Sequence, residues 1–135
     1  MLLEVGRVQQ FIKINKLGDR VLFLENVPNE DMPALYRGAE IFIYPSLFEG
    51  FGIPIIEALS CGTPVITTQG GCFAEAGGKN SIYINPNDHE HLAQEIKKLL
   101  SSAELRKNMS EKGLEHSKIF FPEVIASEMM KIYNL

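Results

Sequence analysis

The order of apolar and polar positions predicts strands and helices that alternate along most of the chain. Short runs of apolar and β-branched residues predict strands at 21–24, 39–44, 64–68 and 81–84. Apolar residues at helical spacing predict helices over 1–16, from Asn29 or Glu30 through Tyr36, and over 54–61, 88–101, 103–117 and 122–133. This alternation is typical of an α/β domain with a Rossmann-like parallel sheet and helices on both faces.

One stretch, residues 44–68, concentrates the candidate chemistry because a strand, a glycine-rich loop, a helix and another strand follow one another there. Gly50 and Gly52 lie in the loop, and Pro54 suits the first position of the helix. Gly62 suits its C-terminal cap. The order predicts a right-handed parallel crossover, with an open site at the carboxyl ends of the strands.

Two acids frame this loop, Glu49 within it and Glu57 in the expected first turn of the helix. Free N–H groups around Gly52, Ile53 and Ile55 would favour a negative or accepting group of a ligand. Carboxylates accept hydrogen bonds from adjacent hydroxyls, so a ligand with both phosphate and vicinal hydroxyls would use the whole site. Nucleotide sugars have that combination. The alternative is that Glu57 only complements the helix dipole and Glu49 is an exposed loop acid.

The string P-S-L-F-E-G-F-G-I-P-I-I-E-A-L-S-C-G-T-P-V-I resembles the E-x7-E signature of retaining glycosyltransferases of group 1, family 4, the glycogen synthase-like enzymes of GT-B fold. The similarity extends from about Leu17 to Pro86, and more loosely to the C-terminus. In that family the motif lies in the C-terminal, donor-binding domain. The family's domain opens with a strand and a Gly-Arg…Lys element that binds the donor diphosphate, and this chain starts on a helix after that point. Arg7, Lys13 and Lys16 do not match that element.

The resemblance implies that residues 1–135 are a single nucleotide-sugar-binding domain, truncated at its N-terminus. Glu49 would be the catalytic residue near the donor sugar, and Glu57 would accept the ribose hydroxyls of a UDP-, GDP- or ADP-sugar. Gly70 and Gly71 would border the cleft. Backbone N–H groups would meet sugar hydroxyls and phosphate oxygens at Phe51, Gly52, Ile53 and Ile55.

The implied reaction is sugar transfer to a polysaccharide or glycolipid acceptor, with retention of configuration and without a metal or other cofactor. Because the acceptor-binding N-terminal domain and the diphosphate-binding cations are missing, we expect the isolated chain to be inactive. Three alternatives stay open. The chain could be a non-catalytic nucleotide-sugar-binding or interaction domain, a fragment of a GT-B-like epimerase or phosphorylase, or a part of a longer gene product that begins before Met1.

The composition of the chain excludes several other classes of protein and binding site. The chain has 135 residues, 45% of them hydrophobic, which suits one globular domain. Its net charge of −4 argues against a nucleic-acid groove or a polybasic membrane patch. No stretch reaches the roughly 18 apolar residues of a membrane span, and no signal peptide is visible. Cys61 and Cys72 are read as reduced thiols of a cytoplasmic protein. His89 and His91, two residues apart, lack the usual metal-ligand spacing.

The last predicted helix carries more apolar residues than one narrow face needs, among them Val124, Ile125 and Met129. In the family this helix crosses back to the N-terminal domain. We therefore expect an exposed apolar face there in this chain.

Overall fold

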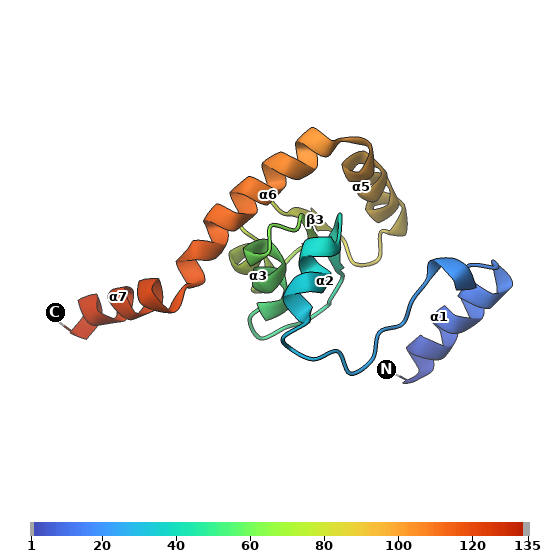
Figure 1. Cartoon of the computed structure of the whole chain (residues 1–135), viewed down its shortest axis with the longest axis horizontal. Helices are drawn as coiled ribbons and strands as arrows, with labels where there is room; N and C mark the ends of the chain where they lie inside the picture. The colour runs from blue at the N-terminus through green and yellow to red at the C-terminus, as the bar shows by residue number, and fades with distance from the viewer. Residues whose placement is uncertain (1, 134–135) are drawn as a thin grey trace.

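The computed structural model describes residues 2–133 and contains a three-stranded parallel sheet with helices around it (Figure 1). The strands are β1 (Phe42–Tyr44), β2 (Val65–Thr68) and β3 (Ile82–Ile84), and they lie in that order. Ile43 lies opposite Ile66, and Ile66 lies opposite Ile82. The strands follow one another in space as in sequence because each connection is a crossover that returns the chain beside the preceding strand.

Helices follow each of the three strands: α3 (Ile53–Ser60), α4 (Phe73–Gly77) and α5 (His89–Ser101). The remaining helices are α1 (Leu2–Ile14), α2 (Met32–Gly38), α6 (Ala103–Ser117) and α7 (Pro122–Tyr133), with single 3₁₀ turns at Gly18–Arg20 and Lys118–Phe120. Most bounds agree with the sequence pattern to within two residues. The short helix α4 was not predicted, because residues 69–75 had the composition of a turn.

The sheet has a separate apolar core on each face, because alternate side chains of a strand point to opposite sides. One core joins Tyr36 of α2, Ile55 of α3 and Phe73 of α4 to Val65. The other joins β2 and β3 to α5 and α6 through Ile66, Ile84, Leu99 and Met109. The predicted parallel sheet with helices on both faces is therefore confirmed.

Two helix bounds differ from the prediction for local reasons. Helix α2 begins at Met32 rather than at Asn29 or Glu30, because the N–H of Asp31 donates to the carbonyl of Pro28 and closes a turn first. Helix α1 ends at Ile14, before the predicted end at residue 16. Lys16 adopts the left-handed conformation at φ 54°, and the following N–H, that of Leu17, donates to Ile12.

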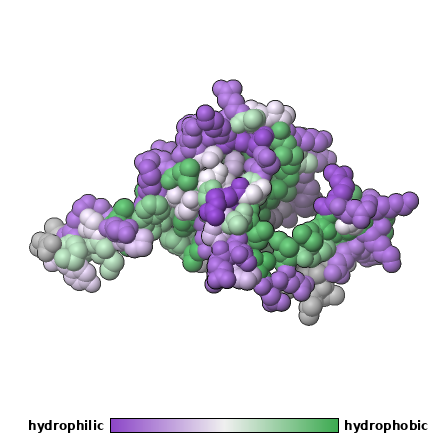
Figure 2. All heavy atoms as spheres, viewed as in Figure 1, coloured by the Kyte–Doolittle hydropathy of each residue, from purple (hydrophilic) through white to green (hydrophobic). Residues whose placement is uncertain are grey.

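The strand predicted at 21–24 does not form, and this prediction was wrong. Val21 is extended, but its neighbour Leu22 is 80% exposed, and Phe23 and Leu24 are about half exposed. A strand needs a hydrogen-bonded neighbour. No described strand pairs with this segment, and β1 is paired on one side only, with β2. Figure 1 shows the segment joining α1 to the rest of the chain, and Figure 2 shows apolar surface along it.

Helix α7 extends away from the sheet and presents apolar side chains to solvent (Figure 1). Val124, Ile125, Met129 and Met130 are between 39% and 55% exposed. The exposed apolar face expected on the last helix is therefore present.

Candidate functional site

The loop after β1 enters α3 through a single tight glycine turn. Gly52 precedes the helix and has φ 88° and ψ 37°, a left-handed conformation that favours glycine. A Cβ at this position would lie 3.1 Å from the Cβ of Ala76 in α4, so the turn is also packed closely. Because α3 begins at Ile53, Pro54 is its second residue, and Glu57 lies in the second turn rather than in the first as predicted.

Three of the four predicted backbone donors at this helix start are free. Among the described residues, the N–H groups of Phe51, Gly52 and Ile53 form no hydrogen bond to a protein acceptor. The prediction for Ile55 was wrong, because its N–H donates to the carbonyl of Gly52 at 3.0 Å. The free groups lie at the positive end of the α3 dipole and suit an anionic or strongly accepting ligand.

Glu49 is fixed within the loop by two hydroxyl donors. Tyr44 and Ser46 donate to its Oε1 at 2.6 Å and 3.0 Å. The hydrogen bond from Tyr44, and then the one from Ser46, lower the pKa of the Glu49 carboxyl below its ordinary value. The same bond is the main cause that raises the pKa of Tyr44 to about 12. At neutral pH the loop therefore holds an ionised carboxylate beside a protonated phenol.

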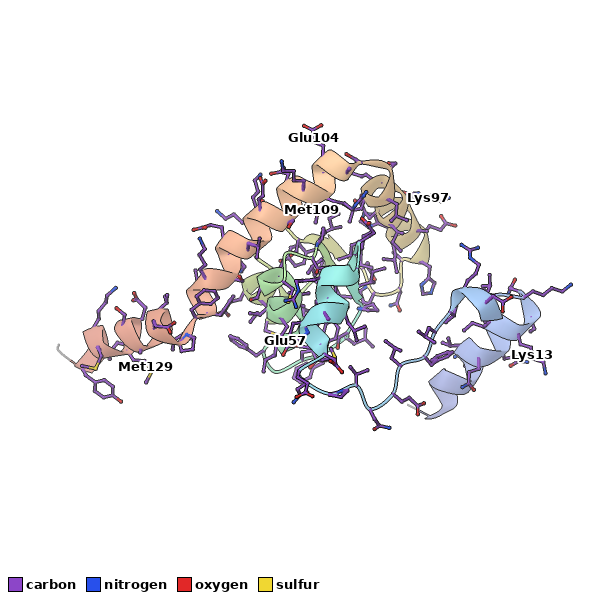
Figure 3. All side chains as sticks on the ribbon, in the orientation of Figure 1. Lys13, Glu57, Lys97, Glu104, Met109 and Met129 are labelled. Atoms are coloured by element: carbon purple, nitrogen blue, oxygen red, sulfur yellow. The ribbon has the colours of Figure 1, made fainter. Side chains whose placement is uncertain are left out.

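Glu57 is held by a tyrosine from another element. The hydroxyl of Tyr36 in α2 donates to Oε2 of Glu57 at 3.0 Å. Burial, and then the hydrogen bond to Glu57, raise the pKa of Tyr36 well above its ordinary value. The phenol thus stays a donor at neutral pH. Figure 3 shows Glu57 on the side of the molecule where α2 and α3 meet.

A cavity of about 430 Å³ opens beside Glu57. Its walls come from α2, α3 and the C-terminal elements and are mostly apolar. They consist of Asn29, Met32, Pro33, Tyr36, Phe51, Ile53, Ile56, Glu57, Ser60, Cys61, Phe120 and Ile125. Glu49 is not among these residues, so this cavity does not bring the two acids together as predicted. None of the lining residues is Lys or Arg.

Gly70 and Gly71 lie at the carboxyl end of β2, beside the Glu49 loop. Both have positive φ, 102° and 54°, and the next residue, Cys72, donates its thiol to the carbonyl of Glu49 at 3.4 Å. The two glycines therefore border the Glu49 side of the sheet edge and not the cavity beside Glu57.

The amino-acid sequence matches a known family. The family model for glycosyl transferases group 1 matches residues 4–116. The chain belongs to this family. It is 36% identical to the O-antigen chain mannosyltransferase B of Escherichia coli, over 85% of this chain and 30% of that protein. The resemblance to group 1 glycosyltransferases is therefore confirmed.

Solved structures agree on the fold of this glycosyltransferase domain. A sucrose-phosphate synthase from Thermosynechococcus elongatus superposes with a TM-score of 0.82 at 30% identity, over 98% of this chain and 34% of that one. The C-terminal domain of a glycosyl transferase group 1 family protein from Francisella tularensis superposes with a TM-score of 0.74 at 24% identity, over 87% of this chain and 62% of that one. The chain thus spans about a third of the curated relative's length.

Sequence reasoning missed the two tyrosines that hold the acids of this glycosyltransferase domain. Tyr44 could have been found, because it ends the strand five residues before Glu49. Tyr36 gave no signal, since 21 residues separate it from Glu57. Both cysteines are free thiols. Within residues 2–133 no group of three or more His, Cys, Asp or Glu side chains could hold a metal ion. None of the described helices combines the length and the apolar character needed to cross a bilayer.

Proposed function

We propose that this chain is the donor-binding part of a retaining glycosyltransferase that transfers a sugar from a nucleotide to a polysaccharide or glycolipid acceptor. The observation that carries the proposal is the placement of Glu57, a carboxylate on the wall of an otherwise largely apolar cavity close to the start of α3. Membership of the family of group 1 glycosyl transferases supports the same reading.

Glu57 is assigned to the ribose. Tyr36 occupies its Oε2, and no described donor occupies its Oε1, which is therefore open to a ligand hydroxyl. The neighbouring cavity surface, including Met32 and Ile53, is apolar. A UDP-, GDP- or ADP-sugar fits this division between a polar ribose contact and an apolar surround.

Glu49 is assigned to the donor sugar as the catalytic residue. Its carboxylate is ionised and fixed by Tyr44, so it can stabilise positive charge that develops on the sugar during transfer. The free N–H groups of Phe51, Gly52 and Ile53 are assigned to sugar hydroxyls and phosphate oxygens. In this proposal Gly70 and Gly71 border the donor-sugar end of the site, and the transfer requires no metal.

Replacing Glu57 tests the ribose assignment. We expect Glu57→Ala to weaken the binding of a nucleotide sugar by about 10- to 100-fold, because hydrogen bonds to a charged group contribute roughly 1.5–3 kcal/mol. The measurement is calorimetric titration of the purified chain with UDP-, GDP- and ADP-glucose and GDP-mannose. Glu104→Ala is the control, since Glu104 lies at the opposite side of the molecule in Figure 3. Equal affinities of the wild type and Glu57→Ala would contradict the assignment.

The isolated chain is expected to show no sugar transfer. The leaving diphosphate needs positive charge, and no Lys or Arg lines the cavity. The acceptor site, in this proposal, is supplied by a part of the enzyme outside residues 1–135. The measurement is nucleotide release from each nucleotide sugar in the presence of polysaccharide or glycolipid acceptors. A full-length group 1 glycosyltransferase with its own substrates serves as the positive control. Turnover by the purified chain alone would overturn this expectation.

The absence of Lys and Arg from the lining also favours a second candidate, a non-catalytic nucleotide-sugar-binding or interaction domain. The titrations separate nucleotide-sugar binding from a pure interaction role. Binding that depends on Glu57 supports a nucleotide-sugar-binding domain, and no binding of any nucleotide sugar supports an interaction domain. The donor-domain proposal includes a cytoplasmic location, where the two free thiols would stay reduced.

A further inference from the structure

Each acid of the proposed donor site receives a hydrogen bond from a tyrosine. Tyr44 holds Glu49 and Tyr36 holds Glu57, although the two tyrosines come from different elements, β1 and α2. The two hydrogen bonds are therefore independent of each other only if the two tyrosine rings do not contact a common residue.

The rings are joined by Phe42. The Phe42 ring packs edge to face on Tyr36, with centroids 5.2 Å apart and planes at 83°. It also stacks on Tyr44, with centroids 5.8 Å apart and planes at 18°. Phe42 and Tyr44 are two positions apart on β1 and so lie on the same face of the sheet. Tyr36, Phe42 and Tyr44 thus make one continuous aromatic row between the two acids.

Buried threonines fix the backbone at both ends of this row. The Thr63 hydroxyl donates to the carbonyl of Tyr36 at 2.6 Å, and the Thr67 hydroxyl donates to the carbonyl of Tyr44 at 2.9 Å. Both threonine side chains are almost completely buried. A tyrosine whose backbone is anchored and whose ring is packed has few orientations for its hydroxyl, so the carboxylate that it contacts is also restricted.

We infer that the aromatic row of Tyr36, Phe42 and Tyr44 sets the positions of both Glu49 and Glu57, which makes these three residues positioning residues for the proposed donor site. The inference rests on the proposed function for its role in nucleotide-sugar binding, but its geometry is independent of any ligand. The row runs from α2 to β1, and it couples the two acids because a shift of Phe42 displaces both tyrosine rings.

The ligand-free test is a ¹³C NMR titration of the side-chain carboxyl of Glu49. We expect its pKa to be below the ordinary glutamate value in the wild type and to rise in Tyr44→Phe, where the main donor is lost. We expect a rise also in Phe42→Leu, which keeps an apolar side chain, although a smaller one, and removes the stack. Tyr133→Phe is the control, because Tyr133 is 76% exposed on α7.

Ser46 and Cys72 are the other polar side chains that contact Glu49, and all of these variants retain both. Circular dichroism checks that each variant is folded. An unchanged pKa in Tyr44→Phe would overturn the positioning role of Tyr44. An unchanged pKa in a folded Phe42→Leu would overturn the coupling through the row. If Phe42→Leu does not fold, Phe42→Met, which also removes the ring but keeps an apolar side chain, replaces it with the same expectation of a raised pKa.

The ligand test compares nucleotide-sugar affinities by calorimetry, with UDP-glucose and GDP-mannose as probes. We expect Tyr36→Phe to weaken binding by about 3- to 10-fold, the effect of losing one hydrogen bond that orients Glu57. Tyr133→Phe should bind as the wild type does. Unchanged affinity in Tyr36→Phe would overturn the role of Tyr36. If the wild type binds none of UDP-, GDP- and ADP-glucose and GDP-mannose, the proposed function fails, and the carboxyl titration still decides whether the row positions Glu49.

Discussion

Ile66→Ala is expected to lower the free energy of unfolding by about 2–5 kcal/mol, the usual effect of truncating a buried isoleucine. Ile66 lies in the middle strand of the sheet, is fully buried and packs with Ile84, Leu99 and Met109. Both the lost apolar burial and the cavity left behind contribute, because three neighbouring side chains are fixed by their own helices and strands. Urea unfolding followed by circular dichroism measures the change.

Leu22→Ala is the matched control for this prediction. Leu22 is an aliphatic residue of the segment that the sequence pattern assigned to a buried strand, yet it is 80% exposed. We expect this substitution to change the free energy of unfolding by no more than about 0.5 kcal/mol. A loss comparable to that of Ile66→Ala would show that residues 21–24 are buried in solution and would restore the predicted strand.

Gly52→Ala is expected to lower the free energy of unfolding by about 1–3 kcal/mol, because a side chain is strained at φ 88°. The new Cβ would also press against the Cβ of Ala76, which belongs to α4 and has little room to move. Relief of this contact would shift the start of α3 and the free N–H groups beside it, so nucleotide-sugar binding should also weaken. Urea unfolding and calorimetric titration measure the two effects.

Gly50→Ala separates this backbone requirement from a general effect of loop substitution. Gly50 lies in the same loop, does not have a positive φ, and has no atom near the position of an added Cβ. We expect its unfolding free energy to stay within about 0.5 kcal/mol of the wild type. Equal losses for Gly50→Ala and Gly52→Ala would contradict the role given to the turn at Gly52.

The elements that the sequence predicted well are those whose signals are local. Short apolar and β-branched runs located β1, β2 and β3, and apolar residues at helical spacing located α5, α6 and α7, with a capping residue at the start of α5. For example, Asp88 accepts a hydrogen bond from the N–H of His91, as expected of a residue that begins a helix. The prediction of a strand at 21–24 was wrong because an apolar run indicates only that a segment is able to pair with a strand. Whether a neighbouring strand is present depends on residues far away in the chain.

The candidate site likewise has features that local sequence predicts and features that it does not predict. The glycine turn and the two acids could be placed from their spacing along the loop and helix. The cavity that each acid faces could not be predicted from the sequence, because the cavity beside Glu57 is completed by Phe120 and Ile125 from the far end of the chain. The hydrogen bond between Tyr36 and Glu57 is also a contact between distant positions. Side-chain contacts of this kind follow from tertiary packing, which local pattern does not specify.

The unpaired edge of β1 has a practical consequence for the purified protein. An open strand edge is a template for intermolecular strand addition, and residues 21–24 supply an uncharged, β-prone sequence in the same molecule. Aggregation should therefore grow steeply with protein concentration, and a charge placed within residues 21–24 should improve solubility without touching the proposed donor site.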